Sequence, residues 1–220
     1  IANYNSESVD ISSDGAISKT VNCNGIVSDL TLVVISQIYG GGGNSGSTYK
    51  YDFIELFNRG TSTVSLNGWS VQYTSATGTT WEATNLSNVI LSPGQYYLIQ
   101  EAIGSGGTTN LPTPDEIGTT AMSSTAGKVI LVNSQAPLTG SCPTGPTIID
   151  KVGFGITSNC YEGTGPTLAP SNTTAVFRKS NGCTDTDQNA SDFTASAPIP
   201  RNTSTALNPC TTPTITISTT

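Results

Sequence analysis

The chain has 220 residues, of which only 10% are charged, and its net charge of −7 corresponds to a pI of about 4.3. Its eight Lys and Arg residues are scattered, which excludes electrostatic capture of a nucleic-acid backbone. No apolar run is long enough to span a bilayer, and no stretch of three turns shows apolar residues at helical spacing. Because Gly, Ser, Thr and Asn outnumber helix formers, we predict an all-β protein.

The first 30 residues form a segment that differs from the rest. Alternating residues at 8–12 and 16–21 predict two strands around the turn Asp14-Gly15. This N-terminal arm has too few large apolar residues to bury a core of its own, so we expect it to pair with a sheet that something else provides. Its candidate assembly residues are Val9, Ile11, Ile17 and Val21.

From residue 31 onward the predicted strands are more apolar and regular. Turn signals such as Asn67-Gly68 and Pro93-Gly94 separate them. Strands at this spacing without intervening helices favour an antiparallel β-sandwich over residues 31–203, with a closed barrel as the alternative. The predicted strands lie near residues 32–39, 52–58, 64–66, 69–74, 88–91, 95–100, 128–133, 148–154 and 174–178.

Three further segments are predicted to be irregular. The glycine-rich residues 40–46 are not a phosphate-binding loop, because a strand rather than a helix N-terminus follows them, and we expect a mobile connection. Residues 104–127 read as a polar surface loop. Residues 204–220 form either a Thr/Pro-rich tail or, at 214–218, a final strand.

Five cysteines in a chain so poor in charge indicate an oxidising compartment. Cys142 and Cys160 bracket a predicted strand, while Cys183 and Cys210 bracket a Pro-rich segment. We predict one disulfide within each of these two local pairs. Cys23 is then left over, either as a buried free thiol or in a bond to another chain.

The chain contains no histidine, which excludes Ser-His-Asp, Cys-His and His-ligated zinc chemistry. A glycosidase site needs a placed pair of carboxylates, and no such pair stands out. We therefore expect no enzymatic activity. Glu55 is the unusual acid, because Ile54 and Leu56 flank it within a strand. We expect a structural carboxylate that accepts backbone N–H groups or pairs with Arg59 or Lys50.

Asp185, Asp187 and Asn189 alternate along the chain, and Asp192 follows three residues later. Hard oxygen ligands at a spacing of two are typical of the start of a calcium loop. The central Gly and the distal Glu of an EF-hand are absent, and Asx turns beside Cys183 are the alternative interpretation. We expect no required cofactor, and any calcium here is structural.

Four Asn-X-Ser/Thr sequences offer acceptors for N-linked glycans where the host has the machinery. Clusters of Ser and Thr near both ends are equally suited to O-linked sugars. The four acceptor residues are Asn85, Asn172, Asn189 and Asn202.

Several segments together resemble a bacterial secreted lamin-tail domain over residues 32–202. That resemblance implies an immunoglobulin-like β-sandwich, an extracellular location and no catalysis in the module itself. Modules of this family are often fused to extracellular nucleases or other secreted enzymes. The matching segments are DFIELFN at 52–58, SLNGW at 65–69, LSPGQYYLIQ at 91–100, AGKVILVN at 126–133 and GCTDTDQNASDF at 182–193.

Two functions follow as hypotheses. The first is an extracellular structural subunit that binds copies of itself in a filament, with covalent glycans as a further partner. Either the N-terminal arm or residues 214–218 adds a strand to the sandwich of the next copy. The second is a non-catalytic adhesive or carbohydrate-binding module of a larger secreted protein, such as an extracellular nuclease. In that case the arm folds back on its own sandwich.

Overall fold

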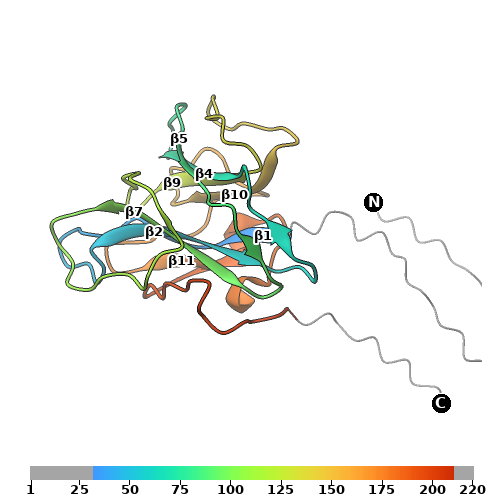
Figure 1. Cartoon of the computed structure of the whole chain (residues 1–220). Helices are drawn as coiled ribbons and strands as arrows, with labels where there is room; N and C mark the ends of the chain where they lie inside the picture. The colour runs from blue at the N-terminus through green and yellow to red at the C-terminus, as the bar shows by residue number, and fades with distance from the viewer. Residues whose placement is uncertain (1–31, 211–220) are drawn as a thin grey trace, which may run out of the picture. The chain divides into compact units, whose positions relative to one another are not determined.

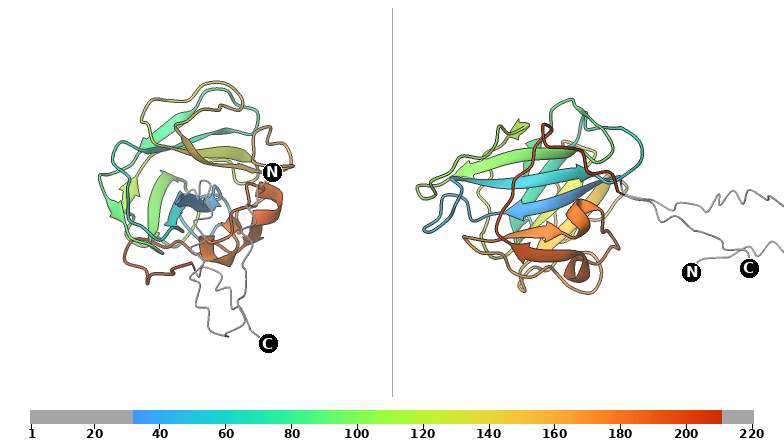
Figure 2. Two further views of the ribbon diagram at one scale, coloured as in Figure 1. Left: turned by 90° about the vertical axis from the view of Figure 1, so that its right-hand side faces the viewer. Right: turned by 90° about the horizontal axis from the view of Figure 1, so that it is seen from below.

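A computed structural model describes residues 32–210 of the chain. The N-terminal arm, Cys23 and the predicted strand at 214–218 lie outside the described residues. Two sheets face each other across a common core, as Figure 1 shows. The prediction of an all-β, immunoglobulin-like sandwich is confirmed, and the alternative of one closed barrel is wrong because the strands divide into separate sheets (Figure 2).

The larger sheet has six strands, and all neighbours are antiparallel except β7 and β8. The order of the strands is β12 (Phe193–Ser196), β11 (Ala175–Arg178), β1 (Val33–Tyr39), β2 (Tyr51–Asn58), β7 (Tyr96–Ile103) and β8 (Glu116–Ile117).

The smaller sheet has four antiparallel strands, and a separate two-stranded ribbon flanks it. Two short helical turns, η1 (Ser180–Gly182) and α1 (Asn189–Asp192), lie between β11 and β12. Across residues 32–210, helices are too short and too polar to cross a membrane. The strands are β10 (Ile148–Phe154), β9 (Gly127–Val132), β4 (Ser70–Ser75) and β5 (Glu82–Asn85), and the ribbon pairs β3 (Val64–Ser65) with β6 (Ile90–Leu91).

Strand β2 explains why the larger sheet has two covered faces. Its residues Ile54 and Leu56 point into the core between the sheets, where they join apolar side chains from β4, β9 and β10. The alternate residues Phe53 and Phe57 point to the outer face, yet they are also fully buried, in two smaller apolar clusters. A strand buried on both faces reads as a continuous apolar run, and an acid within it needs a partner.

A segment that we call the strap, residues 197–210, contributes to the cover over the outer face. Its backbone at Ile199 forms two hydrogen bonds with the Gln37 side chain of β1, at 2.8 and 2.9 Å. Further on, Asn208 N–H donates to the Gly94 carbonyl at 2.9 Å. Residues 204–210, which the sequence assigned to a tail, thus return to the sandwich.

The glycine-rich loop differs from the mobile connection that we expected. Gly40–Gly42 are buried, and Gly42 N–H donates to the Asp52 carboxylate at 2.9 Å. A Cβ atom at Gly42 would lie 1.9 Å from the Tyr51 carbonyl carbon. Glycine is required there because the backbone of the loop packs directly on β2.

Candidate functional site

Glu55, the acid singled out by the sequence, lies buried on the outer face of β2 under the strap. Its carboxylate accepts hydrogen bonds from the Arg201 guanidinium at 2.6 and 3.1 Å, from Arg201 N–H at 2.8 Å and from the Ser36 hydroxyl at 2.6 Å. Arg201 also donates to the Tyr96 hydroxyl at 2.8 Å and stacks over its ring. The acid therefore anchors the strap to the sheet.

The partner of Glu55 is a correction to the sequence analysis. We expected backbone N–H donors or a pair with Arg59 or Lys50. Arg201 N–H is such a donor, but Arg59 pairs with Asp185 at 3.3 Å, and the charged partner of Glu55 is Arg201, 146 residues further along the chain. Burial raises the pKa of Glu55, and the bonds and charge of Arg201 oppose that rise. Removal of either partner of such a pair leaves the other uncompensated.

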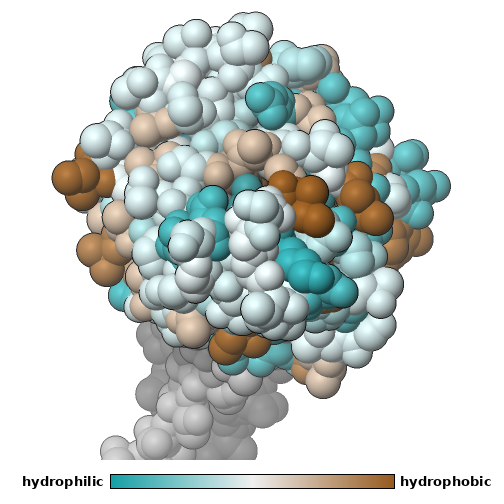
Figure 3. Space-filling model, turned by 90° about the vertical axis from the view of Figure 1, so that its left-hand side faces the viewer, coloured by the Kyte–Doolittle hydropathy of each residue, from teal (hydrophilic) through white to brown (hydrophobic). Residues whose placement is uncertain are grey.

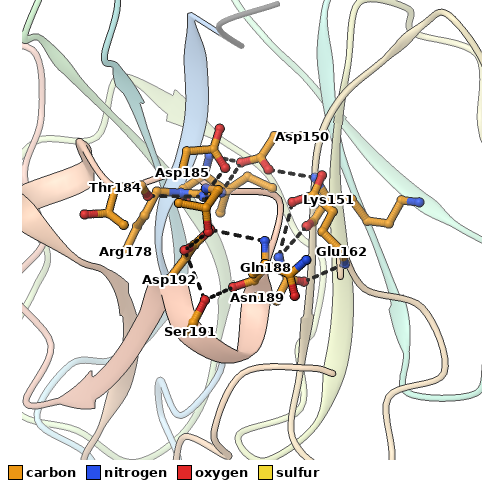
Figure 4. Close-up of polar contacts among 12 residues, drawn as sticks. Asp150, Lys151, Glu162, Arg178, Thr184, Asp185, Gln188, Asn189, Ser191 and Asp192 are labelled. Atoms are coloured by element: carbon orange, nitrogen blue, oxygen red, sulfur yellow. Dashed lines mark hydrogen bonds and ion pairs between the residues drawn. The ribbon is translucent and has the colours of Figure 1, made fainter. Parts of the chain in front are cut away.

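A second buried network surrounds Arg178 of β11 (Figure 4). The guanidinium lies 2.7 Å from the Asp150 carboxylate and 2.8 Å from that of Asp185, with Asp192 at 3.9 Å. Asp150 belongs to β10 and also accepts a 2.6 Å bond from Ile35 N–H of β1. The network thereby joins the two sheets along one side of the sandwich.

The four predicted calcium ligands lie around this network and have separate partners. Asp185 pairs with two arginines, and Asp192 accepts hydrogen bonds from backbone groups four and six residues before it. Asp187 is exposed, with a φ of 54°. Asn189 is fully buried and bonded to β10. These bonds of Asp192 run to preceding residues, whereas an Asx turn runs to the residue two positions further on. Calcium and Asx turns at these residues both stay predictions.

Within residues 32–210, one group of three acids brings its carboxylate oxygens within 4.8 Å of one another: Asp150, Glu162 and Asp185. The sequence singled out only Asp185 of these for a metal. Burial, with neighbouring acids, raises the pKa of Glu162 to about 8, so that it is largely protonated at neutral pH. That proton and the charge of Arg178 together offset the buried carboxylates.

Asn189 closes the edge of β10, a role that its sequence context did not reveal. Its side-chain oxygen accepts from Gly153 N–H at 2.9 Å, and its amide nitrogen donates to the Lys151 carbonyl at 3.0 Å. Thr167 N–H donates to the Gly153 carbonyl at 2.8 Å. One side-chain amide thus replaces part of a neighbouring strand and protects the edge from further pairing.

The four glycosylation candidates differ in the exposure and the hydrogen bonds of their side chains. Asn189 is 0% exposed, with both amide atoms engaged, so the folded chain offers no acceptor there. The amide nitrogen of Asn172 donates to the Ser45 carbonyl at 3.1 Å, and that of Asn202 to the Thr113 carbonyl at 2.9 Å. Asn85, at the end of β5, is exposed and, within the described part of the chain, its side chain forms no hydrogen bond.

Two disulfides join the cysteine pairs that the sequence indicated. Cys142 bonds to Cys160 and encloses β10, and Cys183 bonds to Cys210 and fixes the end of the strap. The second disulfide packs against the outer cluster that contains Phe57. It therefore holds the strap beside the C-terminal end of β2, the end that pairs with the first residues of β1.

Two inward-facing acids hold residues 118–126 over the opposite end of the sandwich. Asp52 accepts from Met122 N–H and Glu101 from Thr120 N–H, each at 2.9 Å. Burial raises the pKa of both carboxyls to about 7. Because backbone donors occupy these oxygens, the arrangement positions a loop.

Strand β12 is the open end of the six-stranded sheet, since within residues 32–210 it pairs with β11 alone. Thr194 and Ser196 on β12, Phe177 and Lys179 on and next to β11, and Ile199 of the strap contribute to a groove of about 340 Å³. An unpaired edge beside a groove is a typical docking place for an extended segment.

The comparisons with known proteins agree with this architecture. No curated protein matches the chain. Among solved structures, a DUF4876 family protein from Bacteroides thetaiotaomicron VPI-5482 is similar with a TM-score of 0.51 and 12% identity, over 81% of this chain and 74% of that one. This likeness concerns the fold alone. The model of the Lamin Tail Domain matches residues 27–155, more than half of the sequence, and the chain therefore belongs to the lamin tail domain family.

Proposed function

We propose that the chain is a non-catalytic, extracellular structural subunit that assembles into a filament by strand donation. The N-terminal arm of one copy pairs with an edge strand of the next. The observation that carries the proposal is the open edge at β12, with its unpaired backbone groups. Donor and acceptor are different surfaces, so the contact is head-to-tail, and it gives an open fibre when the rotation between copies does not close a ring.

The surface of the described residues supports dense packing of copies. Glu82, Lys179 and Asp187 are the only charged residues in residues 32–210 that are exposed rather than buried or partly buried. Figure 3 views the end of the sandwich with the loops around residues 40–50 and shows a mostly pale, weakly polar surface with isolated apolar side chains. Few charges need to be desolvated when such surfaces meet. The two disulfides support an oxidising, extracellular setting.

The absence of catalysis is supported by the inventory of reactive groups. The sequence contains no histidine. The three acids buried on β2 and β7, Asp52, Glu55 and Glu101, use their oxygens to hold backbone segments or an arginine. An acid that already holds the fold in this way is not free to transfer protons to a substrate.

The test is electron microscopy and size-exclusion chromatography of the full chain. We expect long regular fibres from the intact chain, and loss of fibres when residues 1–22 are deleted. Deletion of residues 211–220 is the matched control, because it also removes a Thr/Ser-rich end. A compact monomer that is indifferent to both deletions would contradict the proposal and favour the adhesive or carbohydrate-binding module.

A further inference from the structure

Two sheet edges within residues 32–210, those of β12 and β5, have four residues and pair with a neighbour on one side alone. The edge of β10 is closed by the Asn189 amide and by Thr167. Strand β8 has only two residues, too few to pair with an added strand. Strand β5 has four residues and, within residues 32–210, pairs with β4 alone, so it is the other edge of comparable length.

Charge separates the two four-residue edges further. Strand β5 carries the exposed Glu82, and Glu116 of β8 bonds to Ser87 just beyond β5. The groove beside β12 is lined by Arg178, Lys179 and Arg201, and no acid lines it. The two guanidiniums are engaged with buried carboxylates, whereas Lys179 is exposed and, within residues 32–210, forms no ion pair. Lys179 is therefore the cation available to an incoming segment.

The arm carries the complementary charge. Residues 1–30 contain four acids and one lysine, a net charge of −3. In an extended strand over residues 8–12, Val9 and Ile11 share one face, and Asp10 points to the other. On β12 itself, Phe193 faces the core, while Thr194 and Ser196 face the groove. The arm thus offers an apolar face for the core side and an acid for the groove side.

We infer that residues 8–12 of a second copy add to β12 as a further edge strand, with Val9 and Ile11 on the core side and Asp10 directed to Lys179. This assignment rests on the proposed function and names its acceptor strand and the face that each arm residue presents. Backbone hydrogen bonds to β12 supply affinity, and the charge pair selects the register.

The test is a charge swap measured as the critical concentration for fibre formation of the full chain at low salt. Lys179→Glu and Asp10→Lys are each expected to raise it about five- to tenfold, and the double variant to return it close to the wild-type value. Lys50→Glu, with the same change in net charge, is the control and is expected to leave it unchanged. Thermal unfolding of each variant checks that the sandwich itself is intact.

Two results would overturn the assignment for different reasons. If wild-type fibres depend on residues 1–22 but the double variant assembles no better than the single ones, strand donation stands and β12 is not the acceptor. If the wild-type chain forms no fibres, the proposed function fails, and the assignment fails with it. A charge effect that disappears at about 1 M salt, together with the rescue, supports the pair.

Discussion

Replacing Glu101 with Gln tests whether an ionised carboxylate beneath residues 118–126 weakens the fold. Burial, and then the charges of Glu82 and Glu116, raise the pKa of Glu101 from 4.5 to about 7. An acid with a raised pKa in the folded state favours folding while it is protonated. Its contribution is complete below about pH 4.5 and is lost as the pH rises through about 7.

The magnitude follows from that interval. Each pH unit between the unfolded and folded pKa values is worth about 1.4 kcal/mol, so ionising Glu101 costs the fold about 3 kcal/mol at pH 8. Gln keeps the local bonds, because its carbonyl can accept from Thr120 N–H and its amide can donate to the Thr84 hydroxyl. We expect Glu101→Gln to match the wild type near pH 4 and to be about 3 kcal/mol more stable at pH 8.

The assay is urea unfolding at several pH values between 4 and 8, followed by tryptophan fluorescence with the disulfides intact. Asp187→Asn removes an exposed acid and is expected to change stability little at any pH. Asp52→Asn makes the same charge change but is not an equivalent test. Gly42 and Met122 each donate to one Asp52 oxygen, so Asn would turn its amide donor toward a backbone N–H. A stability difference for Glu101→Gln that is the same at every pH would refute the reasoning.

Three further predictions concern the strap and the closed edge. Arg201→Met leaves Glu55 buried without its counter-charge, and we expect it to lower the free energy of unfolding in urea by about 3–5 kcal/mol. Adding Glu55→Gln should regain part of that loss, whereas a loss below about 1 kcal/mol would contradict the reasoning. Asn189→Leu, close in volume, is expected to cost about 2–3 kcal/mol and to speed amide hydrogen exchange along β10, and unchanged exchange would argue against edge protection. Cys210→Ser opens the 27-residue loop to Cys183 and is expected to lower the free energy of unfolding by about 3–4 kcal/mol in chemical denaturant. An unchanged unfolding midpoint would show that this disulfide does not stabilise the fold.

The long strands could be predicted from the sequence because each buries apolar side chains along most of its length. Strands β1, β2, β4, β9 and β10 overlap their predicted ranges closely. Strands β5 and β12 were missed, since each has one buried residue and lies at a sheet edge. Strand β8, with two residues, was missed within a segment predicted as a polar loop. Such short edges take their conformation from the neighbouring strand rather than from local preference.

The partners of the buried polar residues could not be predicted. An acid between Ile54 and Leu56 indicates that a partner exists, but nothing near Glu55 identifies Arg201, which reaches it only because the strap crosses the sheet. Asn189 illustrates the converse. Its neighbours match both a glycosylation sequence and a calcium-loop spacing, while its contacts show that it completes the hydrogen bonds of β10.

The two disulfides also determine how the domain responds to tension. A chain that is pulled from its two ends transmits force along covalent bonds, and each disulfide carries the load directly between its two cysteines. The first stretch, of 18 residues, includes β10, and the second, of 27 residues, includes α1, β12 and the strap. Both are therefore shielded from extension even if the sheets separate. At about 3.5 Å per residue, the longer loop contains roughly 90 Å of extended chain that cannot be pulled out while its disulfide is intact. Reducing conditions would release that length and make the same domain far more extensible.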